Sequence, residues 1–539
     1  MSLLTMEKLT LDIGGTPILH EIDLSVSPGE ILGVIGESGS GKSMTALSIM
    51  RLLPEGARLG GAIRLMGNDL AACGERQMCG IRGREIGMVF QEPMTALNPV
   101  KTIGDQVAET VLVHTRTGRR EAMEIARRTL ERVGLPADRF PLSRYPHELS
   151  GGQRQRVVIA MAIALRPKLL IADEPTTALD VTTQAQILKL LQGLVREDGM
   201  GMILITHDLA VVAGLADRIA IMRQGEIVES GPTLDVFETM RHPYTRSLFA
   251  ASVHQPLRHR PPEPERQMDP ILDVRDAVRI YPPRGRTLWH RPPAVRAVDG
   301  VSLAIRPGEN VGLVGESGCG KSTLSRAILA LEELQGGEIR LFGKTAGPHM
   351  PNALRAGIQV VFQDPFGSFN PRWTVARLVA EPFHLMQRKP VDAAARVIEA
   401  LEEVGLKAED AHKYIHEFSG GQRQRIAIAR ALITRPELIV LDEAVSALDV
   451  SIRAQILDLL ADLSDRLGIS YLFISHDLSV VRSITDRVMV MKAGKIVETG
   501  PTDDVFNNPQ HPYTRELIAA TPMLSTALSA RRERSSDND

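Results

Sequence analysis

The chain has 539 residues, of which 43% are hydrophobic and 24% charged, and this composition excludes a largely disordered protein. The formal net charge is -2, so the chain lacks the basic surplus expected of a protein that coats nucleic acid. Its only cysteines (Cys73, Cys79 and Cys319) are too few for a disulfide framework, and no run of about 18 apolar residues could span a membrane.

Strand and helix signals alternate along the first half of the chain. A short apolar run at 30–36 ends in glycine, as expected of a buried parallel strand, and residues 44–53 carry apolar side chains at helical spacing. The stretch 102–144 reads as helical, and further buried strands are expected at 169–173 and 202–206. This order predicts an α/β fold, in which a core of parallel strands carries a mostly helical insert.

The second half of the chain repeats the first. GESGSGKS recurs as GESGCGKS, LSGGQRQR as FSGGQRQR, LLIADE as LIVLDE, ITHDL as ISHDL, and HPYTR occurs in both halves. A repeat of about 260 residues indicates a duplicated domain rather than a solenoid unit. We expect a first domain at 1–251, a Pro-rich linker at 252–268, a second domain at 269–524 and a disordered tail at 525–539.

A phosphate-binding loop is predicted in each copy. Both loops fit the pattern G-x-x-x-x-G-K-S and stand between a predicted strand and a predicted helix, the context that this motif requires. Backbone N–H groups and the helix start favour phosphate oxygens, the lysine would reach the β- and γ-phosphates, and the serine hydroxyl would bind Mg²⁺. The loop residues are Gly36, Glu37, Ser38, Gly39, Ser40, Gly41, Lys42 and Ser43, and Gly315, Glu316, Ser317, Gly318, Cys319, Gly320, Lys321 and Ser322.

Two adjacent acids end an apolar strand in each copy. Asp173 and Asp442 would hold Mg²⁺ through water, and Glu174 and Glu443 follow them directly. Neighbouring residues at a strand end point in different directions, so one acid can serve the metal while the other orients the attacking water. Cys319, inside the second loop, is expected to be an inert small side chain that faces away from the phosphate.

Together these motifs resemble the ATP-binding cassette (ABC) family over nearly all of both copies, and LSGGQ is their most specific element. The resemblance implies two tandem ABC nucleotide-binding domains, each a P-loop RecA-like α/β core with a helical insert. It also implies that the two cassettes pair head to tail, so that the signature of one closes over ATP held by the other. The signature residues are Ser150, Gly151, Gly152 and Gln153, and Ser419, Gly420, Gly421 and Gln422.

The resemblance assigns three further pairs of residues. They are a glutamine that senses Mg²⁺ and the attacking water, a switch histidine at the γ-phosphate, and an aspartate in the loop that crosses the interface between paired cassettes. These residues are Gln91 and Gln363, His207 and His476, and Asp180 and Asp449.

The two copies depart from the family pattern in different ways. Tyr281 is placed to stack on adenine in the second copy, whereas the equivalent position of the first lies near Ile13, with no aromatic residue close by. Ala444 and Val445 replace the usual Pro-Thr after Asp-Glu in the second copy and leave Glu443 intact. We therefore predict two hydrolysing sites of unequal rate.

The HPYTR elements, QEPMTALNP and QDPFGSFNP resemble the ATPases of oligopeptide, dipeptide and nickel importers. The fused tandem is most similar to the Yej-type ATPase of peptide and microcin C importers, and the glutathione-importer and nickel types are the alternatives. The resemblance implies an ATPase on the cytoplasmic side of the inner membrane that works with two permease subunits and a solute-binding protein. No iron–sulfur cluster is predicted, because no cysteine follows Cys319.

Other classes fit the sequence less well. Tandem-cassette translation factors usually carry a long, charged helical linker, whereas this linker is short and Pro-rich and the chain is not basic. DNA-repair cassettes carry coiled coils or zinc cysteines, which the sequence lacks. An ATP-binding scaffold without turnover is disfavoured by the intact Glu174 and Glu443.

Overall fold

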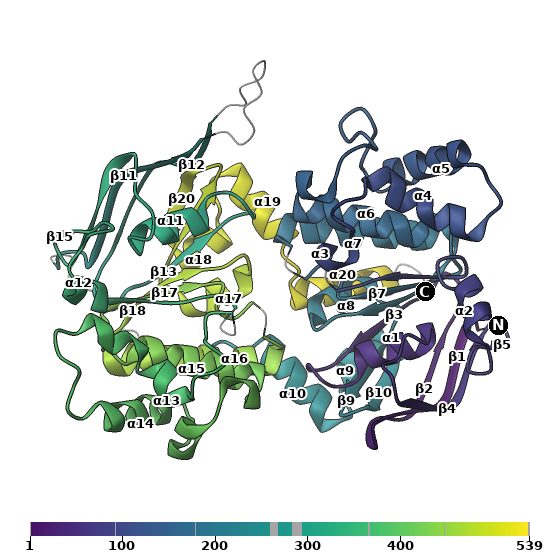
Figure 1. The fold of residues 1–539 in the computed structure, drawn as a ribbon, viewed down its shortest axis with the longest axis horizontal. Coiled ribbons are helices and arrows are strands. Elements are labelled where there is room, and N and C mark those ends of the chain that lie inside the picture. The colour runs from purple at the N-terminus through teal and green to yellow at the C-terminus, as the bar shows by residue number, and fades with distance from the viewer. Residues whose placement is uncertain are drawn as a thin grey trace. The chain divides into compact units, whose positions relative to one another are not determined.

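The computed structural model describes residues 2–91, 93–177, 179–258, 268–282, 294–364, 367–446 and 448–536. The chain forms two compact units, Met1–Val253 together with Pro522–Asp539, and His254–Thr521 (Figure 1). Each unit contains one six-stranded and one four-stranded sheet, and the strand orders of the two units are equivalent, as the sequence repeat predicts. Within the described ranges, no helix is long and apolar enough to cross a membrane.

Two sheets form the first unit. The six-stranded sheet has the order β10-β9-β3-β8-β7-β6 and is parallel except for β10, while the four-stranded sheet has the order β2-β1-β4-β5 and is antiparallel. The strands are β1 (Leu4–Ile13), β2 (Thr16–Val26), β3 (Ile31–Ile35), β4 (Ala57–Leu65), β5 (Asn68–Asp69), β6 (Ile86–Val89), β7 (Leu169–Asp173), β8 (Gly201–Ile205), β9 (Arg218–Arg223) and β10 (Glu226–Pro232).

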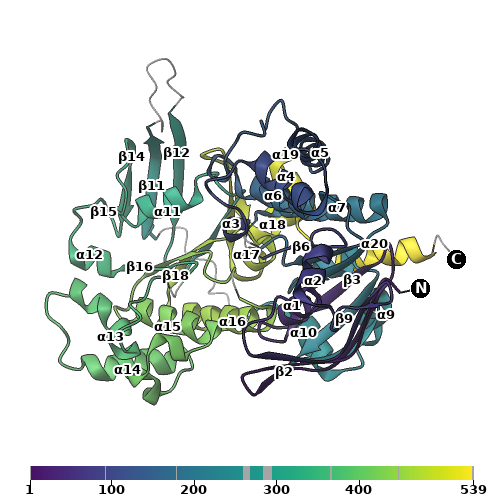
Figure 2. The same cartoon turned by 45° about the vertical axis from the view of Figure 1, so that its right-hand side comes forward.

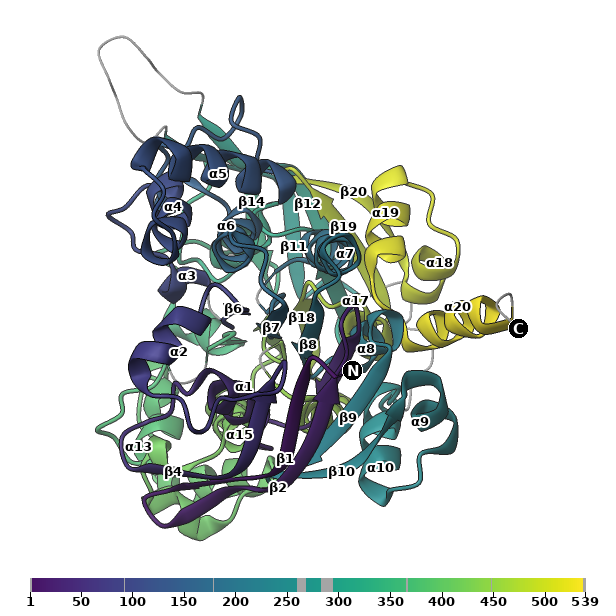
Figure 3. The same ribbon diagram turned by 90° about the vertical axis from the view of Figure 1, so that its right-hand side faces the viewer.

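Helix α1 lies between these two sheets, and its Ala46, Ile49 and Met50 share one apolar core with strands of both (Figure 3). Helices α4, α5 and α6 pack on one another and form the helical insert (Figure 2). The helices of the first unit are α1 (Lys42–Met50), α2 (Glu75–Ile81), α3 (Pro93–Ala96), α4 (Ile103–His114), α5 (Arg119–Arg132), α6 (Gly151–Ile163), α7 (Val181–Asp198), α8 (Leu209–Leu215), α9 (Thr233–Thr239), α10 (Pro243–Ser252) and α20 (Leu524–Ser536).

The second unit repeats this architecture, with sheet orders β16-β17-β18-β13-β19-β20 and β12-β11-β14-β15. Its strands are β11 (Leu272–Tyr281), β12 (Val295–Ile305), β13 (Asn310–Val314), β14 (Gly336–Leu341), β15 (Lys344–Thr345), β16 (Ile358–Val361), β17 (Leu438–Asp442), β18 (Ser470–Ile474), β19 (Arg487–Lys492) and β20 (Lys495–Pro501). Its α-helices are α11 (Lys321–Ile328), α12 (Asn352–Ala356), α13 (Val375–Val379), α14 (Ala393–Glu403), α15 (Gly420–Leu432), α16 (Val450–Leu467), α17 (Leu478–Ile484), α18 (Thr502–Asn507) and α19 (Pro512–Ala520).

The parallel strands are buried on both faces. On β17, Ile439 and Leu441 point into the core shared with the helices, while Leu438 and Val440 point into the core shared with the antiparallel sheet. A strand buried in this way has no polar face, and it therefore reads as a continuous apolar run. The strands predicted at 30–36, 169–173 and 202–206 are accordingly confirmed as β3, β7 and β8.

The end of the chain differs from the predicted disordered tail. Residues Leu524–Ser536 form helix α20, which belongs to the first unit and packs on α8. Arg531 Nε donates to the Ala213 carbonyl (3.0 Å), and Arg532 pairs with Glu238. The segment is polar, but its alanine, leucine and arginine residues favour a helix, and these contacts give that helix a surface to pack on.

The described part of the predicted linker is ordered on the second unit. His254 Nε2 lies 2.7 Å from an oxygen of Asp458 on α16, and Arg258 pairs with Asp486. Residues 259–267 of the predicted linker lie outside the described residues. The N-terminal segment of the first unit ends at Val253, two residues beyond the predicted boundary.

Candidate nucleotide sites

The phosphate loop of the first unit joins β3 to α1. Gly41 precedes the helix with φ 101°, a left-handed conformation that favours glycine, and a Cβ there would come within 2.7 Å of Leu19. Lys42 is buried, and its ammonium donates to the carbonyls of Gly36 and Glu37, both at 2.8 Å. The loop thus holds its lysine at the helix start, where the backbone N–H groups favour an anion.

The second unit reproduces this loop between β13 and α11. Lys321 Nζ donates to the carbonyls of Gly315 (2.7 Å) and Glu316 (2.9 Å), and Gly320 has φ 113°. Cys319 takes the place of Ser40 and is 7% exposed, and its burial raises the pKa of the thiol. The Cys319 Sγ lies 4.0 Å from Lys321 Nζ, and its inertness stays a prediction.

Glu174 lies at the centre of a hydrogen-bonded network in the first unit. Gln91 Nε2 and Thr177 Oγ1 donate to its Oε2 at 2.8 and 2.9 Å, and His207 Nδ1 lies 3.3 Å from its Oε1. Burial pushes the pKa of Glu174 up, but the His207 and Thr177 hydrogen bonds bring it below its ordinary value. The structure therefore brings together Gln91, Glu174 and His207, which were all predicted to act in hydrolysis, and it keeps the glutamate ionised.

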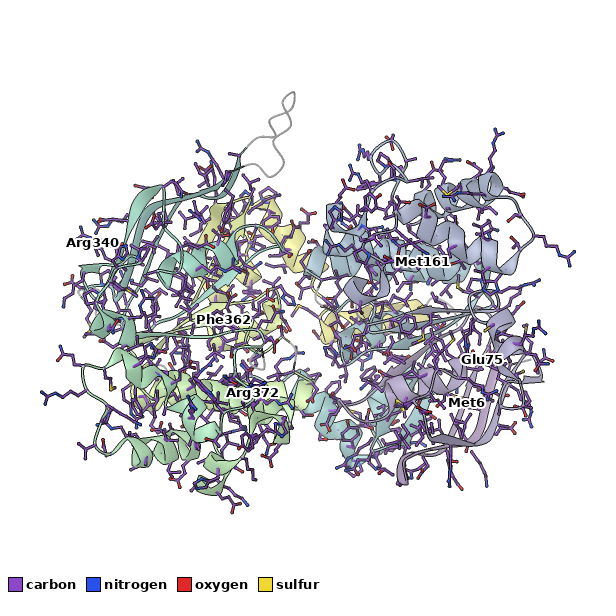
Figure 4. The ribbon with its side chains drawn as sticks, viewed as in Figure 1. Met6, Glu75, Met161, Arg340, Phe362 and Arg372 are labelled. Carbon is purple, nitrogen blue, oxygen red and sulfur yellow. The ribbon has the colours of Figure 1, made fainter. Side chains whose placement is uncertain are left out.

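Glu443 has fewer partners in the second unit. His476 Nδ1 lies 3.2 Å from its Oε1, and burial of Glu443, which raises its pKa, is again outweighed by this histidine. Gln363 is exposed, and no hydrogen bond between it and Glu443 is described. Phe362, labelled in Figure 4, links the end of β16 to Gln363. Both glutamates adopt a left-handed backbone, with φ 45° at Glu174 and 52° at Glu443, and such strain in a residue other than glycine is typical of functional sites.

The aspartates that precede these glutamates suit a metal ion. Asp173 is 6% exposed, and its buried Oδ1 has no hydrogen-bond partner. Burial raises its pKa, and a hydrogen bond from Ser43 partly offsets that rise. Burial likewise raises the pKa of Asp442, whose Oδ2 accepts from Ser325 Oγ (3.2 Å). In the first unit, a buried carboxylate oxygen without a partner, next to the Ser43 hydroxyl, is a donor set that fits Mg²⁺.

The signature residues begin the long helix of each insert. Ser150 caps α6 by accepting from Gln153 N (3.3 Å), and Gln153 accepts in return from Ser150 N (3.0 Å). The same reciprocal cap joins Ser419 and Gln422 on α15. A Cβ on Gly152 would come within 2.3 Å of Thr183 on α7, so this position requires glycine. Gly151, Gly420 and Gly421 occupy the same first turns.

The interface-loop aspartates cap the next helix. Asp180 Oδ1 accepts from Thr183 N at the start of α7, and Asp449 Oδ1 accepts from Ile452 N at the start of α16, both at 3.0 Å. Each aspartate thus fixes the first turn of the helix that it caps.

The segments after the switch histidines differ between the units. Asp208 caps α8 and Asp477 caps α17, each directly after its histidine. Asp477 also accepts from Arg453 Nη1 (2.8 Å), and Arg453 Nη2 donates to the Leu448 carbonyl (3.3 Å). Gln184 occupies the equivalent position of α7, so this charged link between α16 and α17 belongs to the second unit.

Tyr281 ends strand β11 beside the second phosphate loop's helix. Its hydroxyl donates to Glu332 (2.5 Å) and lies 3.5 Å from Thr323 Oγ1 on α11. The guanidinium of Arg279 lies 4.8 Å from the centre of the ring. Most of the insert after Tyr281 lies outside the described residues.

Two functional contacts were not predicted from the sequence. The hydroxyl of Tyr244 accepts from Glu37 N (3.1 Å), and that of Tyr513 accepts from Glu316 N (3.0 Å). Both tyrosines come from the HPYTR motifs, which the sequence singles out only as a family resemblance. Their partners are main-chain groups of the phosphate loops, and a bond to the main chain leaves no pattern in the sequence.

Comparison with family models decides the family. The ABC transporter model matches residues 19–177 and 298–446, and the model of the oligopeptide/dipeptide transporter C-terminal region matches 228–270 and 497–538. The chain belongs to the ABC transporter family. This assignment confirms the two tandem cassettes, the predicted importer group and an ATPase activity, and it supports nucleotide binding.

Full-length relatives agree with this ABC transporter assignment. The chain is 49% identical to the glutathione import ATP-binding protein GsiA of Escherichia coli K12, over 94% of this chain and 86% of the relative. The identity and both coverages are the same for the protein of that name from Shigella sonnei. Among solved structures, CbiO1 from Clostridium perfringens, part of an ABC transporter complex, matches with 29% identity over 44% of this chain and 92% of its own, at a TM-score of 0.39.

Proposed function

We propose that this ABC ATPase is the motor subunit of an importer for small peptides, with glutathione as the first cargo to test. The main support for this proposal is that each cassette has its own pair of glutamate and histidine for hydrolysis and is followed by an oligopeptide/dipeptide transporter C-terminal region. The relatives at 49% identity are glutathione import proteins by name, and glutathione is itself a small peptide. The Yej-type peptide and microcin C cargo remains the second candidate.

Each cassette contributes one set of hydrolysis residues. Lys42 and Lys321 would bind the phosphates, while Glu174 and Glu443 would orient the attacking water. Mg²⁺ would neutralise phosphate charge, held by Asp173 with Ser43 and Gln91 in the first site and by Asp442 with Ser322 and Gln363 in the second. His207 and His476 already contact the glutamates and would sense the γ-phosphate.

The transport cycle follows from differential binding. ATP would favour a head-to-tail pair of cassettes, in which Ser150 and Ser419 each contact the ATP of the other cassette. Hydrolysis removes the γ-phosphate contacts, so the closed state loses its advantage and reopens. Two permease subunits docked at the cytoplasmic side of the inner membrane would follow this motion, and a solute-binding protein would deliver the cargo.

Purification with native partners tests this proposal. We expect the tagged chain, extracted in mild detergent, to retain two integral membrane subunits identified by mass spectrometry. Reconstituted with them in lipid vesicles, it should take up labelled glutathione when ATP is present on the ATPase side. A chain with Glu174→Gln and Glu443→Gln is the matched control, because it should bind ATP without driving uptake.

Different outcomes separate the alternatives. Uptake of a longer peptide but not glutathione would assign the Yej-type cargo. Ribosomal proteins in place of membrane subunits would contradict the importer and favour the translation-factor class.

A further inference from the structure

The HPYTR tyrosines each accept a hydrogen bond from the backbone N–H of the second residue of a phosphate loop. Tyr244 is 4% exposed and accepts from Glu37 N, while the carbonyl of Glu37 accepts from Lys42 Nζ (2.8 Å) and Ser40 N (3.1 Å). The backbone N–H and the backbone carbonyl of Glu37 are therefore both hydrogen-bonded. The loop cannot turn at Glu37 without breaking these hydrogen bonds.

The second unit repeats each of these contacts. Tyr513 is 2% exposed and accepts from Glu316 N, and the carbonyl of Glu316 accepts from Lys321 Nζ (2.9 Å) and Cys319 N (3.3 Å). The arrangement survives although the two loops differ at Ser40 and Cys319.

Other residues of the same unit hold each tyrosine in place. Glu229 on β10 accepts from the backbone N–H groups of Arg241 (2.9 Å) and His242 (3.1 Å), which orients the turn before Tyr244. Burial raises the pKa of Glu229, but the hydrogen bonds from Thr245 and this turn lower it overall, so the acceptor stays charged.

Equivalent groups hold the second tyrosine. Glu498 on β20 accepts from Gln510 N (2.7 Å) and His511 N (3.0 Å). A cation also covers each ring, since Arg223 lies 5.0 Å from the Tyr244 ring centre and Lys492 lies 4.3 Å from that of Tyr513. Each tyrosine is thus held by a turn and by a cation of its own unit.

We propose that Tyr244 and Tyr513 are positioning residues that preorganise the two phosphate loops for ATP. The proposal rests on the proposed role of these loops, and it gives the C-terminal region of each cassette a direct part in nucleotide affinity. Each hydroxyl holds the loop at its second residue, whose carbonyl in turn accepts from the ammonium of the loop lysine. A loop held in its binding shape loses less conformational freedom when ATP arrives.

Removing only the hydroxyl tests this role. Tyr244→Phe and Tyr513→Phe keep the ring, its packing and the cation contact, and they delete the acceptor of the loop N–H. Losing one such hydrogen bond should weaken ATP binding by about 3- to 10-fold. Because each hydroxyl lies at the loop and has no described contact with Glu174 or Glu443, turnover at saturating ATP should stay within about 2-fold.

ATP binding is measured on the full chain, one site at a time, with the phosphate loop of the other site inactivated by a lysine substitution. Binding of the fluorescent analogue mant-ATP with Mg²⁺ is titrated in non-hydrolysing chains that carry Glu174→Gln and Glu443→Gln. Tyr244→Phe is combined with Lys321→Ala, and Tyr513→Phe with Lys42→Ala. The matched controls are Tyr145→Phe and Tyr414→Phe, two exposed tyrosines at equivalent positions of the two units, which should bind as their parents do. In hydrolysing chains, KM for ATP should rise by the same factor as Kd.

Three results would overturn the proposal: an unchanged Kd, a fall in kcat at constant KM, or a rise in Kd that only follows a lowered unfolding temperature. Lys42→Ala distinguishes failure of the underlying assignment. If that variant still bound ATP normally at the first site, the phosphate-loop role itself would be wrong, and the tyrosine proposal would fall with it.

Discussion

Glu174 and Glu443 occupy equivalent positions but are held differently. Gln91, Thr177 and His207 all contact Glu174, whereas the described contact of Glu443 is His476. Ser446 replaces Thr177, and its hydroxyl donates to the backbone carbonyl of Glu443 instead of its carboxylate. The two sites thus differ in the partners of the carboxylate, and a difference between their hydrolysis rates stays a prediction.

Replacing Glu174 and Glu443 one at a time measures how much each site contributes to ATP hydrolysis. We expect Glu174→Gln and Glu443→Gln each to lower steady-state phosphate release while KM for ATP stays within about 2-fold. The amide keeps the shape but cannot accept a proton, and losing a general base typically costs about 10²- to 10⁴-fold at the site concerned. Release of phosphate from ATP is the measurement. An unchanged rate in one variant would show that its site is not essential to turnover.

Asp442 illustrates a conflict between stability and function. Because burial raises its pKa in the folded state, ionising it opposes folding at every pH above that folded pKa. Asp442→Asn should therefore raise the unfolding temperature of the nucleotide-free protein at pH 8 and abolish Mg²⁺-dependent turnover at the second site. The stabilisation should shrink as the pH falls through the folded pKa, and it should vanish well below the ordinary value of about 3.9, where both states are protonated.

Differential scanning calorimetry at several pH values checks this prediction. Asp462→Asn, an exposed residue of α16 paired with Arg466, is the control and should shift the unfolding temperature little. A gain for Asp442→Asn that did not depend on pH would contradict the electrostatic origin.

At the scale of elements, the two kinds of sheet differ in how far the sequence predicts them. The parallel strands carry continuous apolar runs that end in the acids, so both strands and site were predictable. The antiparallel sheet was not predicted. The alternation of β1 is broken at Lys8, which has φ 47°, and Gly60 and Gly61 interrupt β4.

Motifs located the candidate site residues, but not the links between elements. The glutamate, histidine and glutamine positions follow from short patterns that can be read locally. The Arg453–Asp477 pair joins α16 to the start of α17 and has no counterpart in the family pattern, so only the structure reveals it. Burial pushes the pKa of Asp477 up, but the charge of Arg453 helps to lower it overall, so this carboxylate is ionised.

This pair predicts a difference between the two switch helices. Arg453→Gln copies the residue of the first unit and should free α17 from the loop at Leu448, and with it His476. We expect turnover at the second site to fall by about 3- to 10-fold, the range for losing a hydrogen-bonded charge partner, with KM for ATP little changed. Phosphate release measured in a Glu174→Gln background isolates this site.

Two variants complete that comparison. Arg466→Gln removes an exposed arginine from the same helix and should leave the rate unchanged. Arg453→Gln should add nothing to a His476→Ala chain if it acts through the histidine, and a fully additive loss would show that it acts elsewhere.

For the whole molecule, the last helix of the chain is part of the first unit. Leu524 of α20 is 8% exposed, and Arg531 donates to the Ala213 carbonyl near the end of α8. Helix α8 starts at Leu209, one residue after the cap that follows His207. Helix α20 is thus connected to the first hydrolysis site through one short helix, α8.

Truncation after Met523 tests that connection. Without α20, the end of α8 loses its covering contacts, so the backbone amides of α8 should exchange with deuterium faster. Turnover at the first site, measured in a Glu443→Gln background, should fall because His207 is less firmly held. Helix α17 provides an internal control, since it occupies the equivalent place in the second unit and its exchange should not change. Unaltered protection of α8 would show that α20 packs there without stabilising it, and the loss of turnover should then be absent as well.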